Sequence, residues 1–209
     1  MTEFWETSFL ENLTMWGLEP SDSAILARDF FVEKNVRNVL IPGIGYGRNA
    51  KPFLDAGMSV TGIEISQTAI SLARQNGLDV VIHHGSVADM PFDHKLYDGI
   101  FCYALIHLLD KAERSKFIRD CYQQLKPDGY MIFTAISKEA PMFGAGKQLD
   151  QDYYEITEGL RMFFYDSESV KAEFGEYGLV ETVYVTEPHK NMESKPPFQF
   201  LFVKCLKVD

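Results

Sequence analysis

The feature that most constrains this chain is the stretch "NVLIPGIGYGRNAKPFLDAGMSVTGIEIS", which covers residues 38–66. An apolar run leads into three closely spaced glycines, Gly43, Gly45 and Gly47, and a second apolar run ends on Glu64. Glycine lets the backbone turn sharply and lets a ligand approach closely. A helix that begins after such a loop favours a carboxylate or phosphate at its N-terminus. The stretch therefore predicts a strand, a ligand-binding loop, a helix and a second strand.

Apolar runs and helix-like stretches alternate along most of the chain. Short connections between such elements indicate an α/β fold, a mainly parallel sheet covered on both faces, and ligands in such sheets bind beyond the carboxyl ends of the strands. The last two predicted strands are placed to pair antiparallel. Strands are predicted at Asn38–Ile41, Ser59–Ile65, Leu78–His83, Leu96–Tyr103, Tyr130–Ile136, Leu179–Thr186 and Phe198–Lys204, and helices at Asn49–Ala56, Gln67–Gln75, Lys111–Leu125 and Asp166–Tyr177.

Length and charge limit the classes of partner. The 209 residues suffice for one domain with a single core. The net charge of −10 and the absence of a dense Lys/Arg block disfavour nucleic acid and anionic membranes as partners. Three scattered cysteines predict no disulfide framework, and the sequence shows neither a signal peptide nor a membrane-spanning run. We expect a cytoplasmic protein, either a monomer or a homodimer.

Four stretches resemble, in order and at fitting spacing, the class I S-adenosylmethionine-dependent methyltransferases. "VLIPGIGYGRNA" resembles the first motif, "VTGIEIS" the ribose-binding strand end and "GSVADMPF" the adenine-side loop. "LYDGIFCYALIHLL" and "LKPDGYMIFTAIS" resemble the fourth strand, the next helix and the fifth strand. The resemblance covers nearly the whole chain and looks closest to small-molecule members, of the tellurite-resistance type or thiol-methyltransferase-like.

The resemblance implies a fold and a domain organisation. The fold is a Rossmann-like, doubly wound, seven-stranded and mostly parallel sheet with an antiparallel C-terminal strand and helices on both faces. One methyltransferase domain is expected over residues 1–209, with a helical cap at 1–35 and a substrate-cover insertion at 138–165. The cofactor is expected to be S-adenosylmethionine, which leaves as S-adenosylhomocysteine.

The resemblance also implies which residues bind the cofactor. Glu64 is expected to accept hydrogen bonds from the ribose hydroxyls, although a surface acid at a strand end is the alternative. Trp16 either covers the sulfonium with its π face or anchors an N-terminal helix. Arg48 is expected to pair with a carboxylate of the cofactor or of the protein. The full predicted set is Trp16, Gly43, Gly45, Tyr46, Arg48, Asn49, Glu64, Ile65, Ser86, Val87 and Cys102.

Two positions depart from the family pattern. The family usually has an acid two residues before the first glycine, where this chain has Ile41 followed by Pro42. Backbone carbonyls must then do more to order the loop. The adenine-side loop often has Asp after its glycine, where this chain has Ser86, so Ser86 or the N–H of Val87 would contact adenine. Both departures predict weaker cofactor binding.

Tyr103 and His107 are the predicted catalytic residues, because they follow the fourth strand, whose end faces the transferred methyl group in this family. His107 is a candidate general base, since histidine is readily tuned near neutral pH, and its alternative is a structural role at a helix–sheet junction. A thiolate or oxyanion acceptor would need no base. His83 and His84 are adjacent in a strand and point to opposite faces, so no metal site is expected.

The predicted reaction is an in-line methyl transfer to a small-molecule nucleophile, which is sulfur, oxygen, nitrogen or a chalcogen oxyanion. Arg161, Phe163 and Phe164 are candidates for substrate contacts, although a surface salt bridge is the more usual role of a single arginine such as Arg161. Two other functions stay open. A nicotinamide-dependent oxidoreductase prefers G-x-G-x-x-G, and its third glycine position is occupied here by Arg48. A non-catalytic module would bind S-adenosylmethionine as a sensor, or use the fold as a partner platform.

Overall fold

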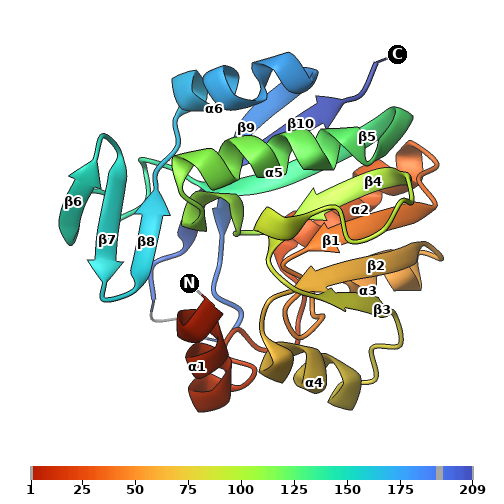
Figure 1. Ribbon diagram of the computed structural model, residues 1–209, viewed down its shortest axis with the longest axis horizontal. Coiled ribbons are helices and arrows are strands. Elements are labelled where there is room, and N and C mark those ends of the chain that lie inside the picture. Colours follow the sequence, from red (N-terminus) through yellow and green to blue (C-terminus); the bar gives the residue numbers. More distant parts are fainter. Residues whose placement is uncertain (1, 192–194, 209) are drawn as a thin grey trace.

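A seven-stranded sheet runs through the protein, whose computed structural model describes residues 2–191 and 195–208 (Figure 1). Strand β10 is antiparallel to both of its neighbours, whereas the other paired strands run parallel, as predicted. In spatial order the strands are β3 (Val81–His84), β2 (Ser59–Glu64), β1 (Asn38–Pro42), β4 (Tyr97–Cys102), β5 (Leu125–Ile136), β10 (Phe198–Leu206) and β9 (Leu179–Glu187).

Helices cover both faces of the sheet and enclose two apolar cores. One core packs α5 and α6 against β4, β5 and β10, and the other packs α2, α3 and α4 against β1 and β2. No helix among the described residues is long and apolar enough to span a bilayer. The helices are α1 (Thr2–Asn12), α2 (Asp22–Glu33), α3 (Lys51–Asp55), α4 (Gln67–Gln75), α5 (Lys111–Gln123) and α6 (Ser167–Phe174), with 3₁₀ turns at Val87–Asp89, Ile106–Leu108 and Gly175–Tyr177.

Local sequence explains where several helices begin. The side chain of Ser66 accepts a hydrogen bond from the N–H of Ala69 and starts α4, and Ser21 does the same for α2. Asp110 and Glu113 form a reciprocal capping box at the start of α5. These caps fix the points at which the chain leaves the strand ends and turns into the helices.

The strand order reverses between β1 and β4, which are neighbours although two strands separate them in sequence. The loops that follow these two strands run in opposite directions, and a crevice therefore opens at the carboxyl ends of the strands. Open α/β sheets bind ligands in such a crevice. The glycine loop follows β1 and the segment from Tyr103 follows β4, so both line this crevice.

A separate three-stranded sheet lies at one side of the molecule (Figure 1) and was not predicted from the sequence. It consists of β6 (Lys147–Asp150), β7 (Tyr153–Thr157) and β8 (Leu160–Phe163). Residues 138–165 were expected to form a substrate-cover insertion, and no strand was predicted within it.

An ion pair joins α5, α6 and β8. Arg114 donates through Nε and Nη2 to the carboxylate of Glu173, with an Nη2–Oε1 distance of 2.9 Å, and its guanidinium lies 4.0 Å from the ring centroid of Phe163. The hydroxyl of Tyr165 donates to the same carboxylate over 2.6 Å. Through the buried Arg114 and the partly buried Glu173, this cluster connects the small sheet to α5 and α6.

Candidate active site

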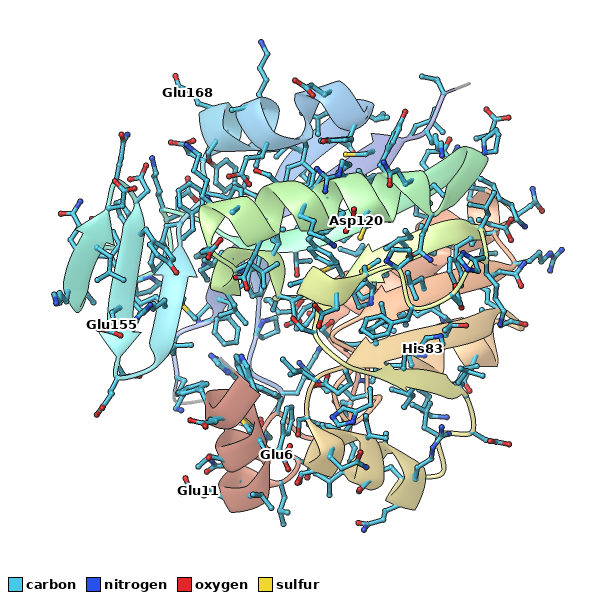
Figure 2. All side chains as sticks on the ribbon, in the orientation of Figure 1. Glu6, Glu11, His83, Asp120, Glu155 and Glu168 are labelled. Atoms are coloured by element: carbon cyan, nitrogen blue, oxygen red, sulfur yellow. The ribbon has the colours of Figure 1, made fainter. Side chains whose placement is uncertain are left out.

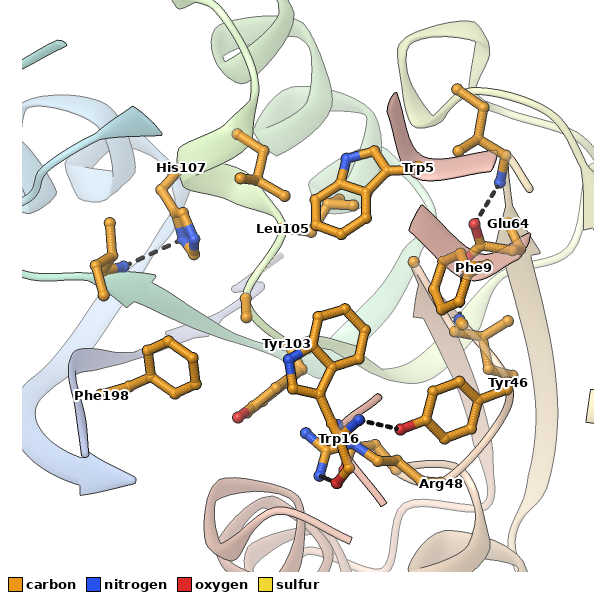
Figure 3. Close-up of a pocket in the computed structure, with 18 of the residues that line it drawn as sticks. Trp5, Phe9, Trp16, Tyr46, Arg48, Glu64, Tyr103, Leu105, His107 and Phe198 are labelled. Atoms are coloured by element: carbon orange, nitrogen blue, oxygen red, sulfur yellow. Dashed lines mark hydrogen bonds between the residues drawn. The ribbon is translucent and has the colours of Figure 1, made fainter. Parts of the chain in front are cut away.

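A cavity lies at the carboxyl ends of β1, β2 and β4, and α1 contributes to its wall (Figure 3). It brings together residues from both ends of the chain. The lining residues are Trp5, Phe9, Trp16, Gly43, Ile44, Gly45, Tyr46, Arg48, Asn49, Glu64, Ile65, Tyr103, Ala104, Leu105, His107, Leu108, Ile136, Met162, Phe198 and Phe200.

The glycine loop is ordered mainly by the backbone. The N–H groups of Gly43 and Ile44 both donate to the carbonyl of Ile63, over 2.8 and 3.1 Å. The N–H of Gly45 donates to Oε2 of Glu64 over 2.8 Å. Ile41, which stands where the family has an acid, is buried in the core. In this loop a backbone carbonyl and the Glu64 carboxylate therefore accept the hydrogen bonds, and the side chain at position 41 takes no part.

Glu64 is a buried carboxylate at the end of β2. Its Oε1 accepts hydrogen bonds from the N–H groups of Ile65 and Ser66, over 2.9 and 3.0 Å. Burial raises the pKa of Glu64, and the hydrogen bonds from Ser66, Gly45 and Ile65 act in the opposite direction. A carboxylate offers about four acceptor positions, so Glu64 keeps capacity for a hydroxyl donor from the cavity.

Aromatic side chains from the N-terminal region lie over the glycine loop. The ring of Trp16 stacks on that of Tyr46 at a centroid distance of 6.4 Å, and Trp5 and Phe9 pack beside them. The hydroxyl of Tyr46 donates to the carbonyl of Gly17 over 2.7 Å and accepts from the N–H of Trp16 over 3.2 Å. Trp16 is therefore both anchored and part of the cavity wall. Trp5 and Phe9 were missed from the sequence.

Arg48 and Asn49 connect the loop to the N-terminal region. Nη1 of Arg48 donates to the carbonyls of Trp16 and Glu19, over 3.3 and 3.2 Å, and its guanidinium carbon lies 5.6 Å from the ring centroid of Tyr103. Within the described residues Arg48 forms no ion pair with a protein carboxylate. Oδ1 of Asn49 accepts from the N–H of Ser21 over 2.9 Å. Arg48 is thus the cationic group of this cavity.

The chain bends sharply after β4. Ala104 has a φ of +51°, a left-handed conformation that costs an alanine about 1–2 kcal/mol. Its N–H donates to Oγ1 of Thr134 over 2.8 Å, which holds the bend in place. Burial raises the pKa of Tyr103, with a smaller contribution from the charge of Glu187. The phenol of Tyr103 therefore stays protonated at neutral pH.

His107 lies in the 3₁₀ turn after this bend and is buried. Its Nδ1 accepts a hydrogen bond from the N–H of Ile136 over 3.1 Å (Figure 3). Because a backbone amide can only donate, Nδ1 carries no proton and Nε2 carries it in the neutral ring. Burial lowers the pKa of His107 to about 3. This environment does not support the general-base role predicted for it.

Other predicted residues lie outside this cavity. Ser86 uses its side chain to cap a 3₁₀ turn, and Val87 and Cys102 pack into the core with α5, so none of the three is among the described lining residues. Arg161 is exposed and pairs with Glu155 over 3.2 Å, which matches its alternative as a surface salt bridge.

Only one residue of the predicted substrate cover reaches the cavity in the described structure. Phe164 is buried beneath the small sheet, and Phe163 contacts Arg114 instead. Met162 directly precedes Phe163 in β8 and lines the cavity, because successive residues of a strand face opposite sides. No group of three or more potential metal ligands occurs within residues 2–191 and 195–208.

Comparison with solved structures identifies the fold. The protein superimposes on a 1,6-didemethyltoxoflavin N1-methyltransferase from Burkholderia thailandensis with a TM-score of 0.75, 17% identity and coverage of 100% of this chain and 87% of that one. It also matches an S-adenosylmethionine-dependent methyltransferase from Clostridium acetobutylicum, with a TM-score of 0.70, 15% identity and coverage of 90% and 91%. The fold is therefore that of the Rossmann-like methyltransferases.

Sequence comparison identifies the family. Residues 40–133 match the pattern of a methyltransferase domain. An uncharacterized methyltransferase of Oceanobacillus iheyensis is 30% identical over 148 residues, which are 64% of this chain and 69% of that protein. A probable S-adenosylmethionine-dependent methyltransferase of Mycolicibacterium smegmatis is 26% identical over 154 residues, and the match spans 69% of this chain but 58% of that protein. The chain belongs to the methyltransferase family.

Proposed function

We propose that the protein is an S-adenosylmethionine-dependent methyltransferase that acts on a small molecule. The observation that carries this proposal is the buried carboxylate of Glu64 beside a glycine loop at the strand-order reversal. Family membership and the fold support it. The predicted assignment to a tellurite-resistance-type or thiol-methyltransferase-like branch belongs to this proposal, as does a single domain over residues 1–209.

The described residues fit the cofactor at three points. In this proposal Glu64, which lines the cavity, accepts hydrogen bonds from the ribose hydroxyls. Gly45 has a φ of +57°, and a Cβ at that position would have only the Cζ atom of Phe9 within 4 Å, so the loop leaves space for a ligand. Arg48 supplies a positive charge for the carboxylate of the amino-acid moiety. S-adenosylmethionine, when bound, supplies a methyl group on a sulfonium leaving group.

The chain's own contribution would be binding, orientation and exclusion of water. The aromatic wall of Trp5, Phe9 and Trp16 limits solvent access, and the rigid turn at Ala104 fixes the groups that follow β4. Orientation of two reactants can supply about 7–11 kcal/mol of the barrier in favourable cases. No proton transfer by a protein group is needed in this scheme.

Calorimetry with S-adenosylhomocysteine tests the proposal. Glu64→Gln removes the charge and places an amide N–H₂ among three backbone N–H donors, so we expect the dissociation constant to rise about 10–100-fold, the equivalent of one or two charge-assisted hydrogen bonds. The matched control is Glu155→Gln on β7 (Figure 2), which should bind like the wild type. Equal affinity of Glu64→Gln and wild type would contradict the assignment.

The oxidoreductase alternative has less support. Arg48 occupies the position of the third glycine in the dinucleotide pattern, and its guanidinium is held against Tyr103 at the cavity wall. The low pKa of His107 also leaves that residue unsuited to proton exchange at neutral pH. A non-catalytic module that only binds the cofactor would pass the calorimetric test but show no methyl transfer, so turnover must be measured separately.

A further inference from the structure

One end of the cavity is built from apolar groups around a single imidazole. The walls come from Ile136, Met162, Phe198 and Phe200, which belong to β5, β8 and β10. The rings of Phe198 and Phe200 stack at a centroid distance of 5.4 Å, and the Phe200 ring lies 6.1 Å from that of His107. Such walls favour a flat, apolar ligand body.

The surroundings of His107 determine which of its two ring nitrogens carries the proton. Nδ1 is occupied by the N–H of Ile136, and Nε2 therefore carries the ring proton. Nε2 has no hydrogen-bond partner among the described residues, although the residue is buried, and this atom is not among the fully enclosed ones, so it faces the cavity that His107 lines. A donor that faces the cavity and has no partner in the protein is available to a ligand atom that can accept its hydrogen bond.

The remaining polar groups of the cavity also favour an acceptor-bearing ligand. Arg48 is a permanent cation, and Tyr103 keeps its phenolic proton. Glu64 already accepts three backbone hydrogen bonds and is reserved for the cofactor in our proposal. None of the described titratable groups in the cavity is thus free to remove a proton from a neutral nucleophile near pH 7.

We propose that Nε2–H of His107 donates a hydrogen bond to the methyl acceptor, and that this acceptor is a planar aromatic molecule whose oxygen or sulfur is already ionised when it binds. This inference rests on the proposed function. The lone pair of the phenolate or thiolate forms the new bond to the methyl carbon, the carbon–sulfur bond of the sulfonium breaks, and its electron pair stays on sulfur. The proton of His107 stays in place throughout.

Two substitutions of His107 distinguish a role as hydrogen-bond donor from a role as general base. In His107→Gln the amide nitrogen lies near the position of Nε2, so the donor is kept. In His107→Asn the shorter side chain can accept from the N–H of Ile136 but does not reach the ligand. Neither amide can act as a base near pH 7. A donor role therefore predicts that Gln retains function and Asn loses it, whereas a base role predicts that both lose it equally.

The probes are 4-nitrothiophenolate and 4-nitrophenolate, which are coloured anions, with neutral nitrobenzene as the matched control. Binding to the S-adenosylhomocysteine complex is followed by absorbance, and methyl transfer by product formation from S-adenosylmethionine. For His107→Asn we expect probe affinity and kcat/KM to fall about 10–100-fold, as for the loss of a hydrogen bond to a charged group. His107→Gln should stay within about threefold of wild type.

Several results would overturn the inference. These are equal losses in both variants, binding of nitrobenzene as tight as that of the anions, or no binding of either anion by a wild-type protein that binds S-adenosylhomocysteine. Failure to bind S-adenosylhomocysteine would instead refute the proposed function. Nitrogen NMR of the wild-type complex gives a readout that needs no variant, because a proton on Nδ1 or a charged imidazole at pH 6–8 would also refute the donor role.

Discussion

At the scale of single residues, Gly45 and Gly47 of the glycine loop have different roles. Gly45 lines the cavity, and a Cβ built there meets only Phe9 Cζ at 3.9 Å. Gly47 is not among the lining residues, and its Cβ would approach Leu78 Cδ2 to 2.5 Å. Both have positive φ values, +57° and +86°. One position therefore leaves room for the ligand, whereas the other permits the loop to pack.

A pair of alanine variants separates these contributions. Gly45→Ala should lower the melting temperature by roughly 2–8 °C, since a left-handed alanine costs about 1–2 kcal/mol, and weaken S-adenosylhomocysteine binding by more than about tenfold. Gly47→Ala should lose more stability, because overpacking against Leu78 adds about 1–3 kcal/mol, yet its folded fraction should bind nearly normally. Melting curves and calorimetry check both. If both variants weakened S-adenosylhomocysteine binding to the same extent, the two glycines would not have the separate roles assigned to them.

The element that closes the cavity is α1, which docks on the start of α4. Glu6 of α1 points toward α4 (Figure 2) and accepts hydrogen bonds from the side chains of Ser66 and Thr68, over 2.6 and 2.5 Å. These bonds lower the pKa of Glu6, because they favour its ionised form. The cavity under α1 measures about 180 Å³. This is below the roughly 300–1,000 Å³ usual for ligand sites, so part of the cavity wall has to move to admit a nucleoside, and α1 is one element of that wall.

Tryptophan fluorescence reports this docking directly, because the two tryptophans of the chain, Trp5 and Trp16, both line the cavity. A depressed carboxyl pKa stabilises docking above the ordinary value near 4.5, and the contribution is lost as the pH falls through the folded-state pKa. We expect wild-type emission to shift to the red below about pH 4.5. Glu6→Gln should show the shift already at pH 7, with docking weakened by about 1 kcal/mol.

The control for α1 is Glu11→Gln, which changes an exposed glutamate of the same helix. It should keep the wild-type emission at pH 7 and the wild-type pH profile. Identical spectra for all three proteins over the whole pH range would show that Glu6 does not hold α1 in place.

At the scale of the whole molecule, the features that could be predicted from the sequence are those that depend on residues close together in the chain. Short contiguous patterns predict the main-sheet strands, the glycine loop and Glu64, and each observed strand overlaps its predicted range. Two bounds were wrong, because β3 begins at Val81, three residues later than predicted, and β5 begins at Leu125, five residues earlier. Phe9 and Phe198 look like core residues in sequence, and only packing brings the two ends of the chain to one cavity. The tautomer of His107 depends on Ile136, in a different strand. Long-range contacts of this kind leave no local pattern.

A melting curve with S-adenosylhomocysteine and with NADH tests the central claim most directly. Ligand at about 100 times its dissociation constant adds roughly 2.7 kcal/mol to the free energy of unfolding. For a chain of this length that corresponds to a rise of about 5–10 °C in the melting temperature. We predict this rise with S-adenosylhomocysteine and no rise with NADH. A rise with NADH alone would contradict the methyltransferase account and favour an oxidoreductase.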